Sequence, residues 1–360
     1  MTEERISDAF RIREHQGAHR TITTSRLRSE GRKTFFFECR SEGEIFVGEA
    51  SPLPGYGSDD PARARRELEE LAPAQWARLR GELESPRLTI EELEELSKPL
   101  TSPAARFALE TAWLEARAAR TGRGLFWLLR GALGKEAKEP PQVPTSAVLD
   151  AAEEEPMARA GALFRAGIRT FKVKCGLDIE REKALLTALS ELGQVHLRVD
   201  PNLAWSREEL EKHSRALTHL PIEYIEDPSL ELSAWKESAL PVAIDEPLTS
   251  LEPKSAALGA SVQFLILKPM ALGGFSRALR WAQVAEQIGA SPIVSHLFDG
   301  PVALDAAAAL AFAVQDPERA AGLGDHAGLF AFSERPRSGL GAFLTPPGVR
   351  AGSARASGPA

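Results

Sequence analysis

The chain has 360 residues, of which 43% are hydrophobic and 26% are charged, with a formal net charge of −7 at pH 7. This apolar content can fill a buried core and excludes a disordered chain, and the length predicts two packed units. The acidic balance argues against a nucleic-acid partner or an anionic membrane surface, because both need a basic face, and favours a small-molecule ligand.

The first residues lack the apolar segment of a signal peptide, and no run of about 18 apolar residues occurs. The two cysteines, Cys39 and Cys175, stand in neither a metal-binding spacing nor a disulfide framework. These features predict a soluble, cytoplasmic protein with reduced cysteines. Nothing in the sequence defines its oligomeric state.

Two apolar, partly alternating runs, residues 34–40 and 44–50, are separated by Ser-Glu-Gly and predict an antiparallel hairpin. Asp60 and Ser102 are each followed by proline, the pattern of a helix start. Residues 1–133 are therefore predicted to form an α+β domain.

Residues 134–143 combine glycine, proline and charge, which indicates a linker. From 144 to 330, short β-rich runs alternate with helical patterns, and their ends lie 19 to 27 residues apart. The seven runs end at Leu149, Lys174, Asp200, Glu226, Asp245, Lys268 and Ser295. With a shorter eighth run, this alternation predicts a closed barrel, and an open doubly wound sheet is the second choice. Residues 331–360 are predicted to be a return segment, which can pack on the first domain, and a mobile tail.

Five of these runs end in an ionisable residue. The carboxyl ends of parallel barrel strands line one mouth, so these five side chains are expected to converge. Three of them, Asp200, Glu226 and Asp245, are carboxylates that would repel one another unless a cation lay between them, and such hard oxygen ligands suit Mg²⁺. The alternative is that each acid caps the helix that follows its strand.

The second run carries two lysines. Lys172 and Lys174 are two residues apart, so both side chains lie on one face of the strand and Phe171 and Val173 lie on the other. A lysine near another cation has a lowered pKa and can act as a base. The alternative, an edge strand protected by lysines, conflicts with the second position in a closed barrel.

Lys268 follows four apolar residues and precedes a glycine pair, a context that favours a site over a solvated strand end. It would face the other lysines from the opposite wall of the barrel. A metal on a substrate carboxylate, with lysines beside the neighbouring carbon, predicts removal of a proton from that carbon.

The segments that carry these residues read FKVKCG, RVDPNLAW, IEYIEDP, AIDEPL and LKPMALGG, and an earlier segment reads GEASPLPGYG. Over residues 34–345, this ordered set resembles the enolase superfamily and, within it, the muconate lactonizing enzyme subgroup, whose hallmark is Lys-x-Lys on the second barrel strand. The resemblance implies an α/β fold, a TIM-type (β/α)7β barrel with an N-terminal α+β capping domain.

Residue by residue, the resemblance implies that Lys174 is the acid and base, that Lys268 is its partner across the site and that Lys172 assists electrostatically. It assigns supporting roles to Asn202 and Glu246. The cofactor it implies is Mg²⁺, for which Mn²⁺ can substitute. The metal ligands it implies are Asp200, Glu226 and Asp245.

Muconate cycloisomerases, dipeptide epimerases, N-acylamino acid racemases and o-succinylbenzoate synthases share these groups, so the fold does not select among them. Dipeptide epimerases usually carry Asp-x-Asp at the eighth strand, where this chain has Gly322, Leu323, Gly324 and Asp325. That run and the compact capping domain resemble the o-succinylbenzoate synthases of menaquinone biosynthesis. The resemblance implies a lyase that dehydrates a cyclohexadiene carboxylate. A racemase or epimerase, a muconate-type cycloisomerase and a non-catalytic barrel stay as alternatives.

Ser295, His296 and Gly322 are predicted to be supporting or substrate-binding residues. The segment SHLFDGP places His296 and Asp299 where many synthases have serines and a glutamate, so their roles stay open. A lone histidine after a strand can also be a packed loop residue. Residues 13–33 contain several arginines and are predicted to close over the barrel mouth, as the specificity loop of the family does.

Overall fold

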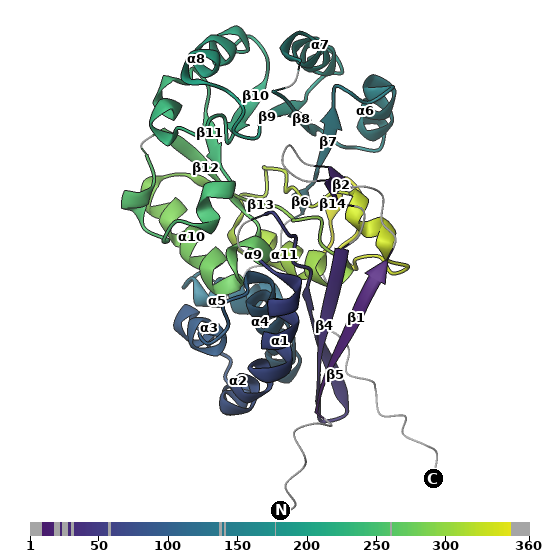
Figure 1. Cartoon of the computed structure of the whole chain (residues 1–360), viewed down its shortest axis with the longest axis vertical. Coiled ribbons are helices and arrows are strands. Elements are labelled where there is room, and N and C mark those ends of the chain that lie inside the picture. Colours follow the sequence, from purple (N-terminus) through teal and green to yellow (C-terminus); the bar gives the residue numbers. More distant parts are fainter. Residues whose placement is uncertain are drawn as a thin grey trace, which may run out of the picture.

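A computed structural model of the chain describes residues 9–17, 22–23, 28–29, 32–56, 59–136, 139, 142–176, 178–259 and 261–346. Figure 1 shows an N-terminal domain of strands and helices packed against a barrel whose strands and helices alternate along the chain. This arrangement confirms the predicted α/β fold with an N-terminal α+β capping domain.

The capping domain contains a three-stranded antiparallel sheet in the order β1-β4-β5. The predicted hairpin is formed by β4 (Arg32–Ser41) and β5 (Glu44–Ala50), and its turn places Glu42 and Gly43 at positive φ. β1 (Phe10–Gly17) pairs along the other side of β4 and was not predicted, because its sequence is mostly polar. A separate short pair is formed by β2 (Ile22–Thr23) and β3 (Arg28–Ser29).

Helices cover one side of this sheet. They are α1 (Pro61–Glu70), α2 (Ala72–Arg78), the 3₁₀ turn η2 (Arg80–Glu84), α3 (Ile90–Ser97), α4 (Pro103–Thr121) and α5 (Leu125–Ala132). Asp60 and Ser102 accept backbone hydrogen bonds at the starts of α1 and α4, as predicted. α4 packs closely on β5, since a Cβ at Gly48 would lie 1.7 Å from the carbonyl oxygen of Ala108. Only glycine allows this approach.

Seven parallel strands form the barrel in the order β13-β12-β11-β10-β9-β8-β7. All seven end within one residue of the predicted ends. They are β7 (Ser146–Asp150), β8 (Thr170–Lys174), β9 (His196–Asp200), β10 (Ile222–Glu226), β11 (Val242–Ile244), β12 (Val262–Leu267) and β13 (Ser291–Val294).

The predicted eighth run closes the barrel with only two residues. Ala321 forms a parallel bridge with Thr145 before β7, and Gly322 forms one with Ser295 after β13. A Cβ at Gly322 would lie 2.6 Å from the Ser295 hydroxyl oxygen, so this contact requires a residue without a side chain. The barrel is therefore closed, and an open sheet is excluded.

Helices join most barrel strands: α6 (Pro156–Arg165), α7 (Ile179–Ser190), α8 (Arg207–Ala216), α9 (Pro269–Leu272), α10 (Phe275–Ile288) and α11 (Pro301–Val314). The connections on either side of β11 differ from the expected helices and contain 3₁₀ turns: η3 (Leu232–Glu237), η4 (Glu246–Thr249) and η5 (Ser255–Ala257). A further turn, η6 (Ala327–Ala331), follows the eighth run. α11 is buried on every side because it packs on α5, β5 and β13.

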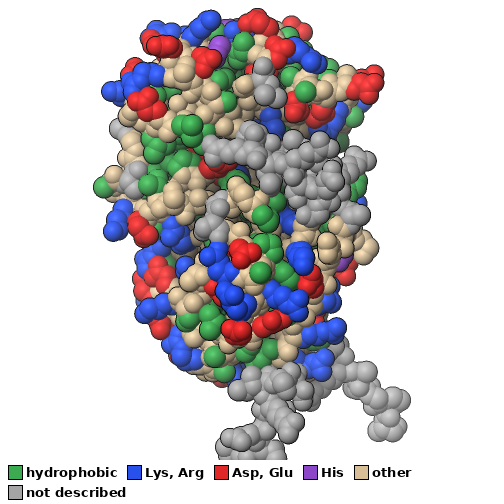
Figure 2. Space-filling model, in the orientation of Figure 1, with side chains coloured by type: hydrophobic (Ala, Val, Ile, Leu, Met, Phe, Trp, Pro, Cys, Tyr) green, Lys and Arg blue, Asp and Glu red, His purple; other side chains and the backbone are tan. Residues whose placement is uncertain are grey.

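Near the predicted linker, β6 (Val143–Pro144) pairs with β14 (Phe343–Leu344) of the return segment. The domain boundaries drawn from the sequence stay predictions, and the predicted tail from residue 347 onward lies outside the described residues. Acidic and basic side chains are interspersed over the face shown in Figure 2. Within the described ranges, no helix combines the length and the apolar character that a bilayer span requires.

Candidate active site

The carboxyl ends of the barrel strands surround a cavity of about 510 Å³. All eleven site residues predicted from the sequence line it: Lys172, Lys174, Asp200, Asn202, Glu226, Asp245, Glu246, Lys268, Ser295, His296 and Gly322. The cavity floor includes Tyr224, Ile266 and Ile293, which belong to the apolar cluster inside the barrel. The charged groups above this floor are therefore largely withdrawn from water.

Lys172 joins two of the predicted metal ligands. Its Nζ lies 2.7 Å from Asp200 Oδ2 and 2.6 Å from Glu226 Oε1. β8 lies between β7 and β9, which removes the edge-strand explanation for this lysine. Burial alone would lower the pKa of Lys172, but the two carboxylates outweigh it and raise the pKa. Lys172 is therefore a cation, and Asp200 and Glu226 converge on one point.

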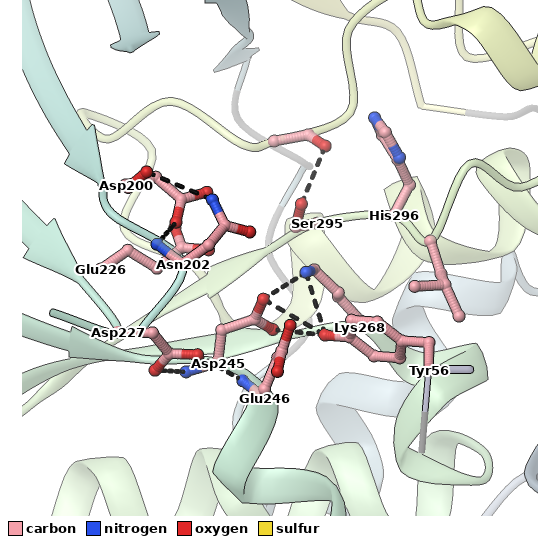
Figure 3. A network of polar contacts seen from close by, with 12 residues as sticks. Tyr56, Asp200, Asn202, Glu226, Asp227, Asp245, Glu246, Lys268, Ser295 and His296 are labelled. Atoms are coloured by element: carbon pink, nitrogen blue, oxygen red, sulfur yellow. Dashed lines mark hydrogen bonds and ion pairs between the residues drawn. The ribbon is translucent and has the colours of Figure 1, made fainter. Parts of the chain in front are cut away.

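Asp245 faces a second cation and a phenol. Its carboxylate accepts a hydrogen bond from Lys268 Nζ and lies 3.3 Å from the hydroxyl of Tyr56, which also lies 3.2 Å from Lys268 Nζ (Figure 3). The Lys268 side chain is only 13% exposed, so it is not a solvated strand end. Tyr56 comes from the capping domain, and the segment GEASPLPGYG that contains it was the available sign of its role.

Lys174 has the opposite electrostatic setting from Lys172. Burial lowers its pKa, and the charges of Lys172 and Lys268 lower it further, while Asp200 partly offsets them. The net shift is downward, which enlarges the neutral, basic fraction of this amine near pH 7. Phe171 and Val173, on the other face of the strand, are fully buried in the main core, as the strand period predicts.

The helix-capping alternative does not describe the carboxylates. Asp245 precedes η4 but makes no capping hydrogen bond, and the helix after β9 is capped by Ser206 instead. Asp200 accepts the backbone N–H of Asn202 at 3.1 Å, which is a local turn rather than a helix cap. The amide of Asn202 donates to the carbonyl oxygen of Asp200, so it supports this strand end.

Asp227 is a buried positioning residue that was not singled out from the sequence. It accepts the backbone N–H of Asp245 at 2.9 Å and of Glu246 at 2.8 Å, and its φ of 42° is unusual for a residue with a side chain (Figure 3). Burial and the charge of Asp245 raise its pKa. The residue lies next to Glu226 in IEYIEDP, which was the available signal.

The donor set fits Mg²⁺ in its chemistry, because three carboxylates stand at consecutive strand ends. In the structure, the carboxylates of Asp200 and Glu226 form ion pairs with Lys172, and the carboxylate of Asp245 forms one with Lys268. Among the described residues, no three His, Cys, Asp or Glu side chains are grouped closely enough to hold one ion. A divalent cation would compete with these ammonium groups. That Asp200, Glu226 and Asp245 are the metal ligands stays a prediction.

The loop after β13 is held by the capping domain. Arg32 of β4 donates to the carbonyl oxygens of Leu297 and Phe298 and to those of Ser51 and Pro52 in its own domain. Asp299 is 1% exposed and lies 3.9 Å from Arg32, so its role is structural. The predicted closing loop includes residues 18–31, whose side chains lie outside the described part of the chain.

Residues 155–348 match the family described as Enolase C-terminal domain-like. The chain therefore belongs to this family, the barrel family of the enolase superfamily, as its motifs predicted. It is 29% identical over 338 residues to the o-succinylbenzoate synthase of Desulfotalea psychrophila, which covers 85% of this chain and 89% of the relative.

Two solved structures with other activities are also similar. The dipeptide epimerase of Methylococcus capsulatus, complexed with Mg and L-Arg-D-Lys, has a TM-score of 0.70 and 26% identity, with 91% of this chain and 92% of that chain covered. The muconate lactonizing enzyme of Pseudomonas fluorescens, complexed with muconolactone, has a TM-score of 0.71 and 20% identity, with coverage of 91% and 90%. The latter likeness concerns the fold alone.

Proposed function

We propose that the protein is an o-succinylbenzoate synthase-like, Mg²⁺-dependent lyase that removes water from a cyclohexadiene carboxylate. The observation that carries this proposal is the pair of lysines, Lys174 and Lys268, that line one cavity at the ends of β8 and β12. The strands β9, β10 and β11, whose ends carry the three carboxylates, lie between these two strands in the barrel. The synthase relative that matches 85% of the chain supports the choice of reaction.

Lys174 acts as the base in this mechanism. Its neutral amine takes the proton from the carbon beside the substrate carboxylate, because its pKa is lowered. The electron pair of the broken C–H bond forms the new double bond, and the C–O bond to the hydroxyl breaks. The ammonium of Lys174 then returns its proton to the departing hydroxide, so proton and hydroxyl leave from one face.

Lys268 and Lys172 act as fixed cations, because carboxylates raise the pKa of each above the usual value. Lys268 would stabilise negative charge that develops on the substrate, on the face opposite Lys174. Asp200, Glu226 and Asp245 would hold the metal ion, which when bound supplies a Lewis acid for the substrate carboxylate. Tyr56 would keep Asp245 and Lys268 in position.

The eighth run supports this reading over a dipeptide epimerase. Gly322 and Gly324 present no side chain to the cavity, and Asp325, which is exposed and lines the cavity, is the single acid among residues 322–325. The paired acids that would hold a substrate ammonium are therefore not formed by this run. A racemase or epimerase remains the second candidate, because lysines on opposite walls and the Methylococcus capsulatus likeness are compatible with proton exchange.

The test is to incubate purified protein and Mg²⁺ with the cyclohexadiene precursor and follow its diene absorbance, with N-acyl amino acids offered in parallel in D₂O. EDTA-sensitive loss of the diene is the expected result. Lys174→Ala should abolish turnover without changing the circular dichroism spectrum, and Glu226→Gln should raise the Mg²⁺ requirement. Deuterium exchange without diene loss would establish the racemase reading instead.

A further inference from the structure

The two barrel helices that follow β12 and β13 each begin at a glycine. α10 follows Gly274 and α11 follows Gly300, so the residue at the start of each helix has no side chain to accept the free backbone N–H groups. α7 and α8, in contrast, are capped by their own Asp178 and Ser206. The first N–H groups of α10 and α11 therefore need acceptors from another part of the chain.

Both acceptors are acids of the capping domain. Glu110 of α4 accepts the backbone N–H of Ser276 at 3.0 Å and the hydroxyl of the same residue at 2.7 Å. Glu49 of β5 accepts the backbone N–H groups of Gly300 at 2.6 Å and of Ala303 at 3.1 Å. Both acids are fully buried. The partial positive charge of a helix start stabilises such a carboxylate, so each acid is the N-terminal cap of a helix in the other domain.

This arrangement requires the two glycines. A Cβ at Gly274 would lie 2.3 Å from the Glu110 carboxylate, and a Cβ at Gly300 would lie 2.7 Å from that of Glu49. Burial raises the pKa of both carboxyl groups, because the hydrogen bonds only partly offset their removal from water. A cap from the helix's own segment, as in α7 and α8, would avoid burying an acid. What the buried acids add is a fixed connection between the domains.

A short hydrogen-bonded turn connects Lys268 to the start of α10. The N–H of Leu272 donates to the carbonyl oxygen of Lys268 at 2.9 Å, and the N–H of Gly274 donates to that of Pro269 at 2.9 Å. These bonds close the turn between β12 and α10, and its helix α9 also packs on α4 (Figure 1). A displacement at Ser276 is therefore transmitted to the end of β12, where Lys268 stands.

We infer that Glu110 is a positioning residue for Lys268: it fixes the start of α10 from the capping domain and, through the turn, the place of the Lys268 ammonium in the cavity. This inference rests on the proposed function, in which Lys268 stabilises negative charge that develops on the substrate. Glu110 is not among the described residues that line the cavity, and it takes no part in proton transfer.

The test compares two buried acids of the capping domain that are bonded alike. Within the described part of the chain, Glu110 accepts three hydrogen bonds, which come from Ser97 and Ser276. Glu67 of α1 also accepts three, from residues 101–102, but these bonds stay inside the capping domain. Glu110→Met and the control Glu67→Met keep the length of the side chain and remove both acceptor oxygens. With Mg²⁺ and the cyclohexadiene precursor, kcat and KM are measured and corrected for the folded fraction, and circular dichroism gives Tm.

Both variants should lower Tm, because each leaves buried donors without an acceptor. Glu110→Met should also lower kcat about 10- to 100-fold with KM unchanged, since a catalytic group misplaced by about 1 Å can cost about 100-fold. Glu67→Met should keep the wild-type kcat. Equal kcat in the two variants, or a rise in KM alone for Glu110→Met, would overturn the inference. If Glu110→Met does not fold, Ser276→Ala takes its place, because it removes only the hydroxyl bond to Glu110; an unchanged kcat there would also overturn the inference.

Hydrogen–deuterium exchange separates this inference from the proposed function. The amides of residues 268–276 should exchange faster in Glu110→Met than in Glu67→Met, whatever reaction the protein catalyses, and no such local increase would overturn the inference. A wild type that does not consume the precursor, together with this increase, would refute the dehydration and keep Glu110 as the residue that fixes the Lys268 segment. A wild type that consumes the precursor, with kcat unchanged in Glu110→Met, would refute the positioning role and keep the dehydration.

Discussion

Replacing Arg32 by methionine should destabilise the protein far more than replacing an exposed arginine of the same sheet. The Arg32 guanidinium is buried between the two domains, where it donates to carbonyl oxygens on both sides and faces the buried carboxylate of Asp299. Methionine fills a similar volume but has no donor. The variant leaves Asp299 as a buried charge without its cation and several carbonyl oxygens without a hydrogen bond.

The expected magnitude follows from the burial of this pair. Removing one partner of a buried ion pair costs about 3–5 kcal/mol. An unfolding entropy of about 2.1 cal/mol/K per residue gives about 0.76 kcal/mol/K for a chain of 360 residues. Arg32→Met should therefore lower Tm by about 4–7 °C. The substitution does not change the catalytic lysines. If activity falls by more than the fraction of unfolded protein explains, the loop that carries His296 has been displaced.

Thermal unfolding followed by circular dichroism measures this effect, with Arg13→Met as the matched control. Arg13 lies on β1 of the same sheet and pairs with Glu38, but its side chain is 45% exposed, so the loss should stay below about 1 kcal/mol. The double variant Arg32→Met, Asp299→Asn should recover part of the lost stability, because it also removes the buried negative charge that Arg32→Met leaves without a cation. Equal Tm changes for Arg32→Met and Arg13→Met, or strictly additive losses in the double variant, would refute the reasoning.

Three further predictions concern the cavity. Tyr56→Phe removes a hydrogen bond to the Asp245 carboxylate and should lower kcat about 13- to 160-fold with Tm unchanged, as expected for a hydrogen bond to a charged group. An unaltered kcat would exclude a positioning role for Tyr56. Asp227→Asn keeps one carbonyl oxygen and therefore loses one of its two hydrogen bonds to the backbone, which should raise the half-saturating Mg²⁺ concentration about 10- to 100-fold. The measurement is a titration of activity with Mg²⁺, and an unchanged midpoint would contradict the prediction. Lys174 must be neutral to take a proton, and its pKa is lowered from 10.5, so kcat/KM should rise with pH and level off below pH 10.5. A pH profile of kcat/KM whose rise has its midpoint at or above pH 10.5 would contradict the lowered pKa.

The sequence alone predicted the barrel and its charged mouth, because the information is local. Strand period and helix-start residues depend on neighbours a few positions apart, and they located all seven barrel strand ends within one residue. The same period placed Lys172 and Lys174 on the inner face and Phe171 and Val173 in the core. Parallel strands then brought the predicted residues to one cavity, since their carboxyl ends share one edge.

Only the tertiary structure decided which other residues join them. Tyr56 meets Lys268 across 212 positions of sequence, and Arg32 meets the loop after β13 across 265, through the docking of the capping domain on the barrel. His326 lies against His296 because the eighth run closes the barrel with two residues and turns back over the mouth. Such contacts leave no periodic pattern in the chain, because they depend on how separately formed elements pack. The sequence by itself therefore determined the strand ends and the chemistry they carry, and tertiary packing determined the partners that hold and complete the site.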